Sequence, residues 1–126
     1  MRSKSYGIVR VTTREQTLVD CLMHPGRSGG VEETVRSCSA FPYLDVDALL
    51  EILEGASATT LSRVGWLFDV KRDSWNISKD ALNELKGQLG KGPYRLDPKV
   101  GETRGWSSYW KLCLPETEEE VLSWTS

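Results

Sequence analysis

The residues best suited to acid, base or nucleophilic chemistry gather around the single histidine of the sequence. Asp20 and His24 lie four residues apart, which places two side chains on one face of a helix, and Cys21 stands between them. A thiol near an imidazole and a carboxylate is typical of a cysteine nucleophile. However, His24 precedes Pro25 at an expected helix end, where a histidine commonly contacts terminal carbonyls. Cys21 fits a small buried residue. We therefore expect no catalytic residue and no enzymatic activity.

The other cysteines, carboxylates and glycines do not indicate a metal or phosphate site. One histidine is too few for a multi-histidine metal site. The three cysteines are far apart in the sequence, so they form neither a CxxC pair nor a disulfide framework, and they favour a reducing cytosol. Acidic runs at 32–33 and 118–120 are typical of solvated helix starts, and the glycines at 87, 90 and 92 are typical of a helix end and a turn. We expect no cofactor and no metal.

Cations mixed with aromatic residues are the clearest sign of a binding surface. Trp75, Tyr94 and Trp106 are interleaved with basic residues. This mixture is typical of phosphate contact combined with stacking, or of an aromatic hot spot at a protein interface. A solvated rim around core tryptophans is the alternative. The basic residues expected to form one positive face are Arg63, Lys71, Arg72, Lys86, Lys91, Arg95 and Lys99.

Arg14 occupies an unfavourable place for a cation, because the first turn of a helix is the positive end of its dipole. Either it pairs with an acid such as Glu15 or Glu33, or it faces a partner. The candidate contact residues are therefore exposed cations, for a protein or nucleic-acid partner: Arg14, Arg63, Lys71, Arg72, Lys91 and Arg95.

Length and composition indicate a single domain over residues 1–126. The chain has a mass of 14.2 kDa, with 39% hydrophobic and 27% charged residues, which is typical of a chain that folds. Its net charge of -2 lacks the excess of a dedicated nucleic-acid binder, although it is compatible with a local basic face. No apolar run has the length of a signal peptide or of a bilayer span. We expect a cytoplasmic protein with no membrane partner.

Apolar spacing and capping residues predict five to six helices. A capping box at Thr12 or Thr13 precedes the first helix, and Asp45 and Ser78 are suitable caps for later ones. The expected helices span residues 14–23, 31–40, 46–54, 58–70 and 79–89, with a last short helix over 115–120.

Two β-rich segments lie near the ends of the chain. Residues 7–11 and 109–114 are rich in β-branched or aromatic residues, and we expect these two strands to pair. Between Pro93 and Trp106 the helical periodicity stops and loops are expected. The predicted fold class is α+β: a mostly helical single domain with a small sheet built from strands near the two chain ends.

The order of several short motifs resembles the C-terminal domain of the AbiEi family, the antitoxins of abortive-infection toxin–antitoxin systems. The first motifs are Val11-Thr12-Thr13, Thr17-Leu18-Val19-Asp20 and Gly29-Gly30-Val31-Glu32-Glu33. They are followed by Leu49-Leu50, by Arg63-Val64-Gly65-Trp66-Leu67 and by Trp110-Lys111-Leu112. The resemblance runs from about residue 9 to residue 114.

This resemblance implies a function. In that family an N-terminal winged helix-turn-helix binds operator DNA, and the C-terminal domain counteracts a nucleotidyltransferase toxin and assists repression. The present sequence begins where that C-terminal domain begins, so we expect the N-terminal winged-helix domain to be absent. Helix capping and a polar helix face explain the threonines and Asp20 of these motifs, so we interpret them as markers of the fold. Contact with a partner is then left to exposed cations and tryptophans.

We therefore expect a non-enzymatic antitoxin or regulatory domain of a bacterial type IV toxin–antitoxin system used in phage defence. Its expected partners are the cognate nucleotidyltransferase toxin, without a required stable complex, and operator DNA through the full-length protein. No small-molecule substrate is expected. The alternative is a DNA-binding accessory domain of a transcriptional regulator that is unrelated to antitoxin action.

Overall fold

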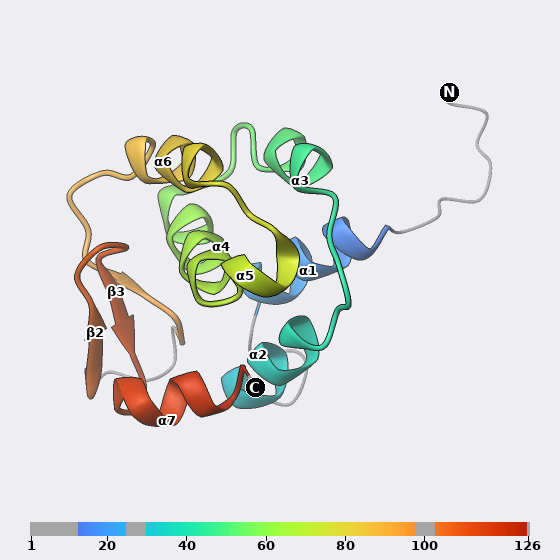
Figure 1. The fold of residues 1–126 in the computed structure, drawn as a ribbon. Coiled ribbons are helices and arrows are strands. Elements are labelled where there is room, and N and C mark those ends of the chain that lie inside the picture. The colour runs from blue at the N-terminus through green and yellow to red at the C-terminus, as the bar shows by residue number, and fades with distance from the viewer. Residues whose placement is uncertain (1–12, 25–29, 98–102, 126) are drawn as a thin grey trace.

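A computed structural model describes residues 13–24, 30–97 and 103–125. Helices form most of it, and a three-stranded sheet lies beside them (Figure 1), which confirms the predicted mostly helical α+β class. The helices are α1 (Arg14–Met23), α2 (Val31–Ser39), α3 (Val46–Ile52), α4 (Ala58–Val70), α5 (Arg72–Trp75), α6 (Lys79–Gly87) and α7 (Glu118–Ser123). The strands are β1 (Tyr94–Arg95), β2 (Gly105–Ser107) and β3 (Leu112–Leu114). Among the described helices none has the length and apolar character needed to cross a membrane.

Local capping explains where most helices begin. The Thr13 side chain accepts a hydrogen bond from the Gln16 N–H at 3.1 Å, so Thr13 and not Thr12 caps α1. The same contact, from a capping side chain to an N–H three residues later, opens α3, α4, α6 and α7. Each bond satisfies an amide that the helix itself leaves without a partner. Helix α2 differs, because its cap is Gly30, which has no side chain to offer.

Helix α4 is the centre of the fold. Its residues from Thr60 to Phe68 are all buried, and it packs against α1, α6 and the sheet. Trp110 is 1% exposed and lies against Gly65, where an added Cβ would collide with the indole ring. The Ser62 hydroxyl donates to the Trp110 carbonyl at 2.7 Å, and the Trp110 indole N–H donates to Asp69 at 3.0 Å. One helix thus holds Trp110, in the turn between β2 and β3, by packing and by two hydrogen bonds.

The sheet has the order β1-β3-β2, with β3 parallel to β1 and antiparallel to β2. The prediction of one strand over 109–114 is correct only for Leu112–Leu114. Because Ser107 pairs with Leu112, the residues between them must reverse the chain, and Lys111 takes a positive φ of 56° there. The predicted strand over 7–11 lies outside the described residues. Within the described part, β1 and β2 are the partners of β3.

Other boundaries also differ from the prediction. The short helix α5 was not expected; it ends at Asn76, which has a left-handed φ of 53°. Helix α7 begins at Glu118 and not near Pro115, because Thr117 supplies its cap. Strands β1 and β2 lie in the segment expected to form loops. Strands of two or three residues are too short to show a period in the sequence.

Candidate functional site

The register of the sheet brings Arg95, Cys113 and Trp106 into one row. Arg95 of β1 lies opposite Cys113 of β3, and Cys113 lies opposite Trp106 of β2. Directly opposed residues of neighbouring strands point to the same side of a sheet. We call this row the sheet face. Figure 1 shows the sheet at one edge of the molecule, beside α4.

Burial shows that the sheet face is turned to solvent. Trp106 is 45% exposed, Arg95 is exposed and Cys113 is half-buried, whereas Leu112 and Leu114 on the other side of β3 are fully buried. The other four tryptophans of the chain are 1 to 3% exposed. Trp106 is therefore the single tryptophan with a ring available to a partner.

The chain around the sheet face is basic. Residues 85–96 and 104–114 contain no Asp or Glu, and their cations are Lys86, Lys91, Arg95, Arg104 and Lys111. Several of these cations are held in place. Lys111 donates to the Gly90 carbonyl at 2.8 Å, Lys86 lies 5.0 Å from the ring centre of Tyr109, and Arg104 lies 3.5 Å from Glu116. These two segments are thus positively charged and partly ordered, while the acidic helix α7 packs against β2.

The prediction that Arg63 contacts a partner from the surface is corrected by its burial. Arg63 is 5% exposed in α4. Its guanidinium donates to the carbonyls of Leu22 at 2.8 Å, Met23 at 3.3 Å and Arg95 at 2.7 Å. Burial lowers the pKa of this guanidinium, and the nearby Asp97 carboxylate opposes that shift. Arg63 therefore joins the end of α1 to β1 and is absent from any surface.

Three other predicted contact residues make local contacts elsewhere. Arg14 lies 4.3 Å above the ring of Tyr43 and reaches the Tyr43 carbonyl at 3.4 Å, instead of pairing with Glu15 or Glu33. Lys71 donates to the carbonyl of Thr125 at 3.3 Å. Arg72 lies 3.7 Å from Asp69. These three cations do not join the row of the sheet face.

The structure brings together only part of the expected positive face. Lys86, Lys91 and Arg95 lie in the basic segments at the sheet, whereas Lys99 lies outside the described residues. Sequence reasoning missed Arg104 and Lys111 as members of this group. Arg104 lies two residues before Trp106 and Lys111 directly follows Trp110, so closeness to a tryptophan in the sequence was the available signal.

Trp75 and Tyr94, the two other aromatic residues predicted for a binding surface, do not present an exposed ring. Trp75 is 3% exposed, packs edge-on against Phe68 and donates from its indole to the Phe41 carbonyl at 2.9 Å. Tyr94 is half-buried, and its hydroxyl accepts from the Gly90 N–H at 2.8 Å. Both residues therefore make contacts within the fold. Of the three predicted aromatic residues, Trp106 is the one whose ring is exposed for stacking with a partner.

Asp20 and Cys21, the predicted partners of His24, each contact another residue. Asp20 accepts from the Gln16 amide at 2.9 Å, and His24 is exposed at the end of α1. Cys21 faces Cys38 of α2; burial, reinforced by Cys21, raises the pKa of the Cys38 thiol to about 12. A thiol with this pKa stays protonated at neutral pH, so Cys38 is a poor nucleophile.

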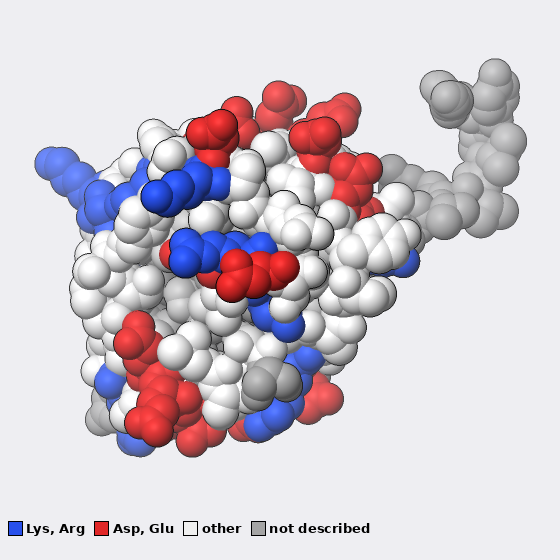
Figure 2. All heavy atoms as spheres, in the orientation of Figure 1, with Lys and Arg blue, Asp and Glu red and all other residues white. Residues whose placement is uncertain are grey.

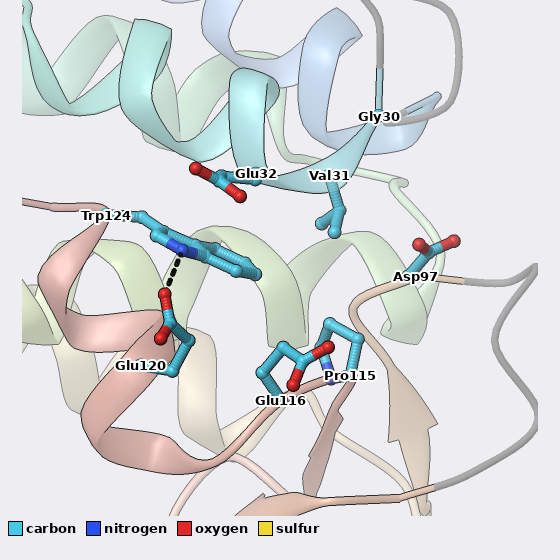
Figure 3. A pocket seen from close by; sticks show the side chains of 8 residues that line it. All are labelled: Gly30, Val31, Glu32, Asp97, Pro115, Glu116, Glu120 and Trp124. Carbon is cyan, nitrogen blue, oxygen red and sulfur yellow. Dashed lines mark hydrogen bonds between the residues drawn. The ribbon is translucent and has the colours of Figure 1, made fainter.

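A hollow lies between the start of α2 and α7 (Figure 3). Its volume is about 460 Å³, and its lining includes Glu32, Asp97, Glu116 and Glu120. Glu120 accepts from the Trp124 indole at 3.1 Å, and Glu32 pairs with Arg36 at 2.9 Å. Within the described residues no three His, Cys, Asp or Glu side chains are placed to hold one metal ion. The geometry therefore offers carboxylates here but no assembled centre.

A second acidic region lies between α3 and α6, where the upper rim of the molecule is red in Figure 2. Two adjoining hollows of about 330 and 430 Å³ share Asp47, Leu50 and Glu84. We call this region the acidic edge, and its carboxylates are Asp47, Glu51, Glu54, Asp80 and Glu84. No Lys or Arg lines either hollow.

Comparisons of the chain with family models, with curated proteins and with solved structures found no match.

Proposed function

We propose that this chain is a non-enzymatic antitoxin or regulatory domain of a bacterial type IV toxin–antitoxin system. In this proposal it counteracts a nucleotidyltransferase toxin in the cytoplasm and assists transcriptional autoregulation. The order of the AbiEi-like motifs along the sequence supports this assignment. The surface that would meet a toxin, its RNA or an operator is the sheet face.

The positions of the motif residues are consistent with this division between fold and function. Thr13 caps α1, and Leu18, Leu49, Val64 and Leu67 are all buried in the core. Residues of these types are required by helix caps and by packing. The motifs therefore account for the frame of the domain, and a partner must be recognised by exposed residues outside them.

The observation that carries the proposal is the solvent-facing row of Arg95, Cys113 and Trp106 within acid-free segments. Cations steer the approach of an acidic or RNA-bound partner, and an exposed indole is a common anchor once contact is made. This row contains both kinds of group on one short sheet.

A growth-rescue assay tests the proposal. The domain is co-expressed with a candidate nucleotidyltransferase toxin, and growth is measured for wild type, for Arg95→Glu combined with Trp106→Ala, and for Tyr43→Ala. Tyr43 is 62% exposed and lies outside the sheet, so its variant is a matched surface control. We expect rescue by wild type and by the control, and its loss in the double variant. Absence of rescue by a folded, well-expressed wild-type domain would contradict antitoxin action in this chain.

The alternative function, a DNA-binding accessory domain of a regulator, is favoured by the same basic segments. Its test is a titration of operator-containing duplex DNA at several salt concentrations. Phosphate contacts make affinity fall steeply with salt, because binding releases counterions from the DNA. A flat salt response would count against this second function.

A further inference from the structure

The sheet face combines an exposed indole and an exposed cation on the two strands that flank β3. Trp106 and Arg95 lie on two different strands with Cys113 between them, so the row crosses all three strands. Neighbouring strands are about 5 Å apart, which separates the indole from the Arg95 position by about 10 Å. The small Cys113 side chain leaves a shallow surface between a flat ring and a cation.

The chemistry of this row fits a base and a phosphate. An exposed indole offers a ring on which any unpaired base is able to stack, and an arginine offers donors to phosphate oxygens. Lys91 lies three residues before β1, and Lys111 directly precedes β3, so both add positive charge close to the sheet. Residues 85–96 and 104–114 contain no Asp or Glu, so neither segment carries a negative charge that would repel the phosphates of a nucleic acid.

Other classes of partner fit this surface less well. The core of a protein interface contains several apolar and aromatic side chains, but Trp106 is the only large apolar side chain in this row. Bases of a duplex are stacked on one another, so their rings are closed to an indole. A single strand presents both free base faces and phosphates.

We propose that the sheet face binds single-stranded nucleic acid, with one base stacked on Trp106 and the backbone held by Arg95. This inference rests on the proposed function, since it assigns a ligand class to the surface through which that function acts. RNA and DNA share the two features that the row recognises. The experiment therefore includes both.

Intrinsic tryptophan fluorescence is a direct readout, because Trp106 is the one exposed indole of the five. Short oligouridine and oligothymidine are titrated into the whole domain at low salt, alongside a duplex of the same length. We expect both single strands to quench the fluorescence and the duplex to bind more weakly. A duplex that binds more tightly than either single strand would overturn the proposal, as would the absence of quenching by both single strands.

Substitutions test whether the oligonucleotides bind at the sheet face. With fluorescein-labelled oligonucleotides and anisotropy as the readout, Trp106→Ala is expected to weaken affinity about tenfold. Trp106→Phe, which keeps a ring, is expected to recover part of that loss. Arg95→Gln is expected to weaken affinity and to reduce the salt slope by about one. Tyr43→Ala and Arg36→Gln change an exposed ring and an exposed cation outside the sheet, and we expect wild-type affinity for both.

Folding and function are checked separately from binding. Circular dichroism verifies that each variant keeps its helices, which the exposed position of Trp106 favours. Wild-type affinity in folded Trp106→Ala would show that the sheet face is not the site. Growth rescue without oligonucleotide binding would reject this inference and leave the proposed function standing, whereas binding without rescue would reject the antitoxin assignment alone.

Discussion

The sheet face and the acidic edge have opposite charge within one small domain. The segments around the sheet, residues 85–96 and 104–114, contain cations and no carboxylate. The hollows between α3 and α6 are bordered by carboxylates and by no cation. The net charge of -2 is a sum over the whole chain and therefore describes neither region. A partner meets the local charge of the surface that it approaches.

The two regions also differ in how their charges are held. Cations at the sheet contact Tyr109, Gly90 and Glu116. The five carboxylates of the acidic edge form no ion pair with any residue that the structure describes. Asp47 and Glu51 are four residues apart on or beside one turn of α3, as are Asp80 and Glu84 on α6, and like charges at this spacing repel. The carboxylates of the acidic edge therefore repel anions, whereas the cations of the two sheet segments favour their approach.

The largest expected effect comes from removing the Arg63 guanidinium, which links the end of α1 to β1. Arg63→Met removes the three hydrogen bonds to the carbonyls of Leu22, Met23 and Arg95, and it leaves these carbonyls without that donor. We expect a loss of about 3 kcal/mol in the free energy of unfolding, measured by urea denaturation. Arg72→Met is the matched control, since Arg72 is in an exposed ion pair with Asp69. An equal effect of both variants would contradict the role of Arg63 as a buried link.

A second variant tests the same link through packing. Gly65→Ala places a methyl group where the Trp110 ring lies, and the main chain of Trp110 is held by Ser62. We expect a loss of about 2 kcal/mol in the free energy of unfolding, because overpacking forces the core to move. Gly87→Ala is the control: an added Cβ there meets no atom within 4 Å. If Gly65→Ala unfolds at the wild-type urea concentration, Trp110 is not fixed against α4.

Charge reversal compares the two regions directly. Arg95→Glu places a carboxylate on the sheet face, and we expect it to weaken the binding of oligothymidine about tenfold through lost attraction and added repulsion. Glu51→Lys makes the opposite change at the acidic edge, and we expect affinity within about twofold of wild type, since that charge acts only at long range. Anisotropy titrations at one salt concentration measure both. Equal effects would mean that net charge, and not the sheet face, governs binding.

The smallest expected effect is on stability at the acidic edge. Glu51→Lys replaces a repulsive pair with Asp47 by an attractive one four residues apart. We expect a gain of about 0.5 kcal/mol in the free energy of unfolding at low salt, which added salt reduces. Urea denaturation at two salt concentrations measures it. Destabilisation by this variant would indicate that the carboxylates of the edge are not in mutual repulsion.

Much of the helical framework is determined by the sequence itself. Thr13, Asp45 and Ser78 each bond to an amide three residues later, and the apolar residues that follow recur at helical spacing. These interactions are local, so the types of nearby residues are enough to predict them. The start of α1, α3 and α6 follows from this short-range order, and so does the mostly helical character of the chain.

The surface that is open to a partner was decided only by the tertiary structure. Trp106 and Trp110 are four residues apart in the sequence, yet one ring is 45% exposed and the other is 1% exposed. The difference arises because the Trp110 ring packs against Gly65 of α4. Trp106 instead lies opposite Cys113 of β3, on the side of the sheet that faces solvent. Arg63 is buried for the same kind of reason, since its acceptors are 32 to 41 residues away. Contacts at such separations depend on how helices and strands pack, and local sequence carries no record of that packing.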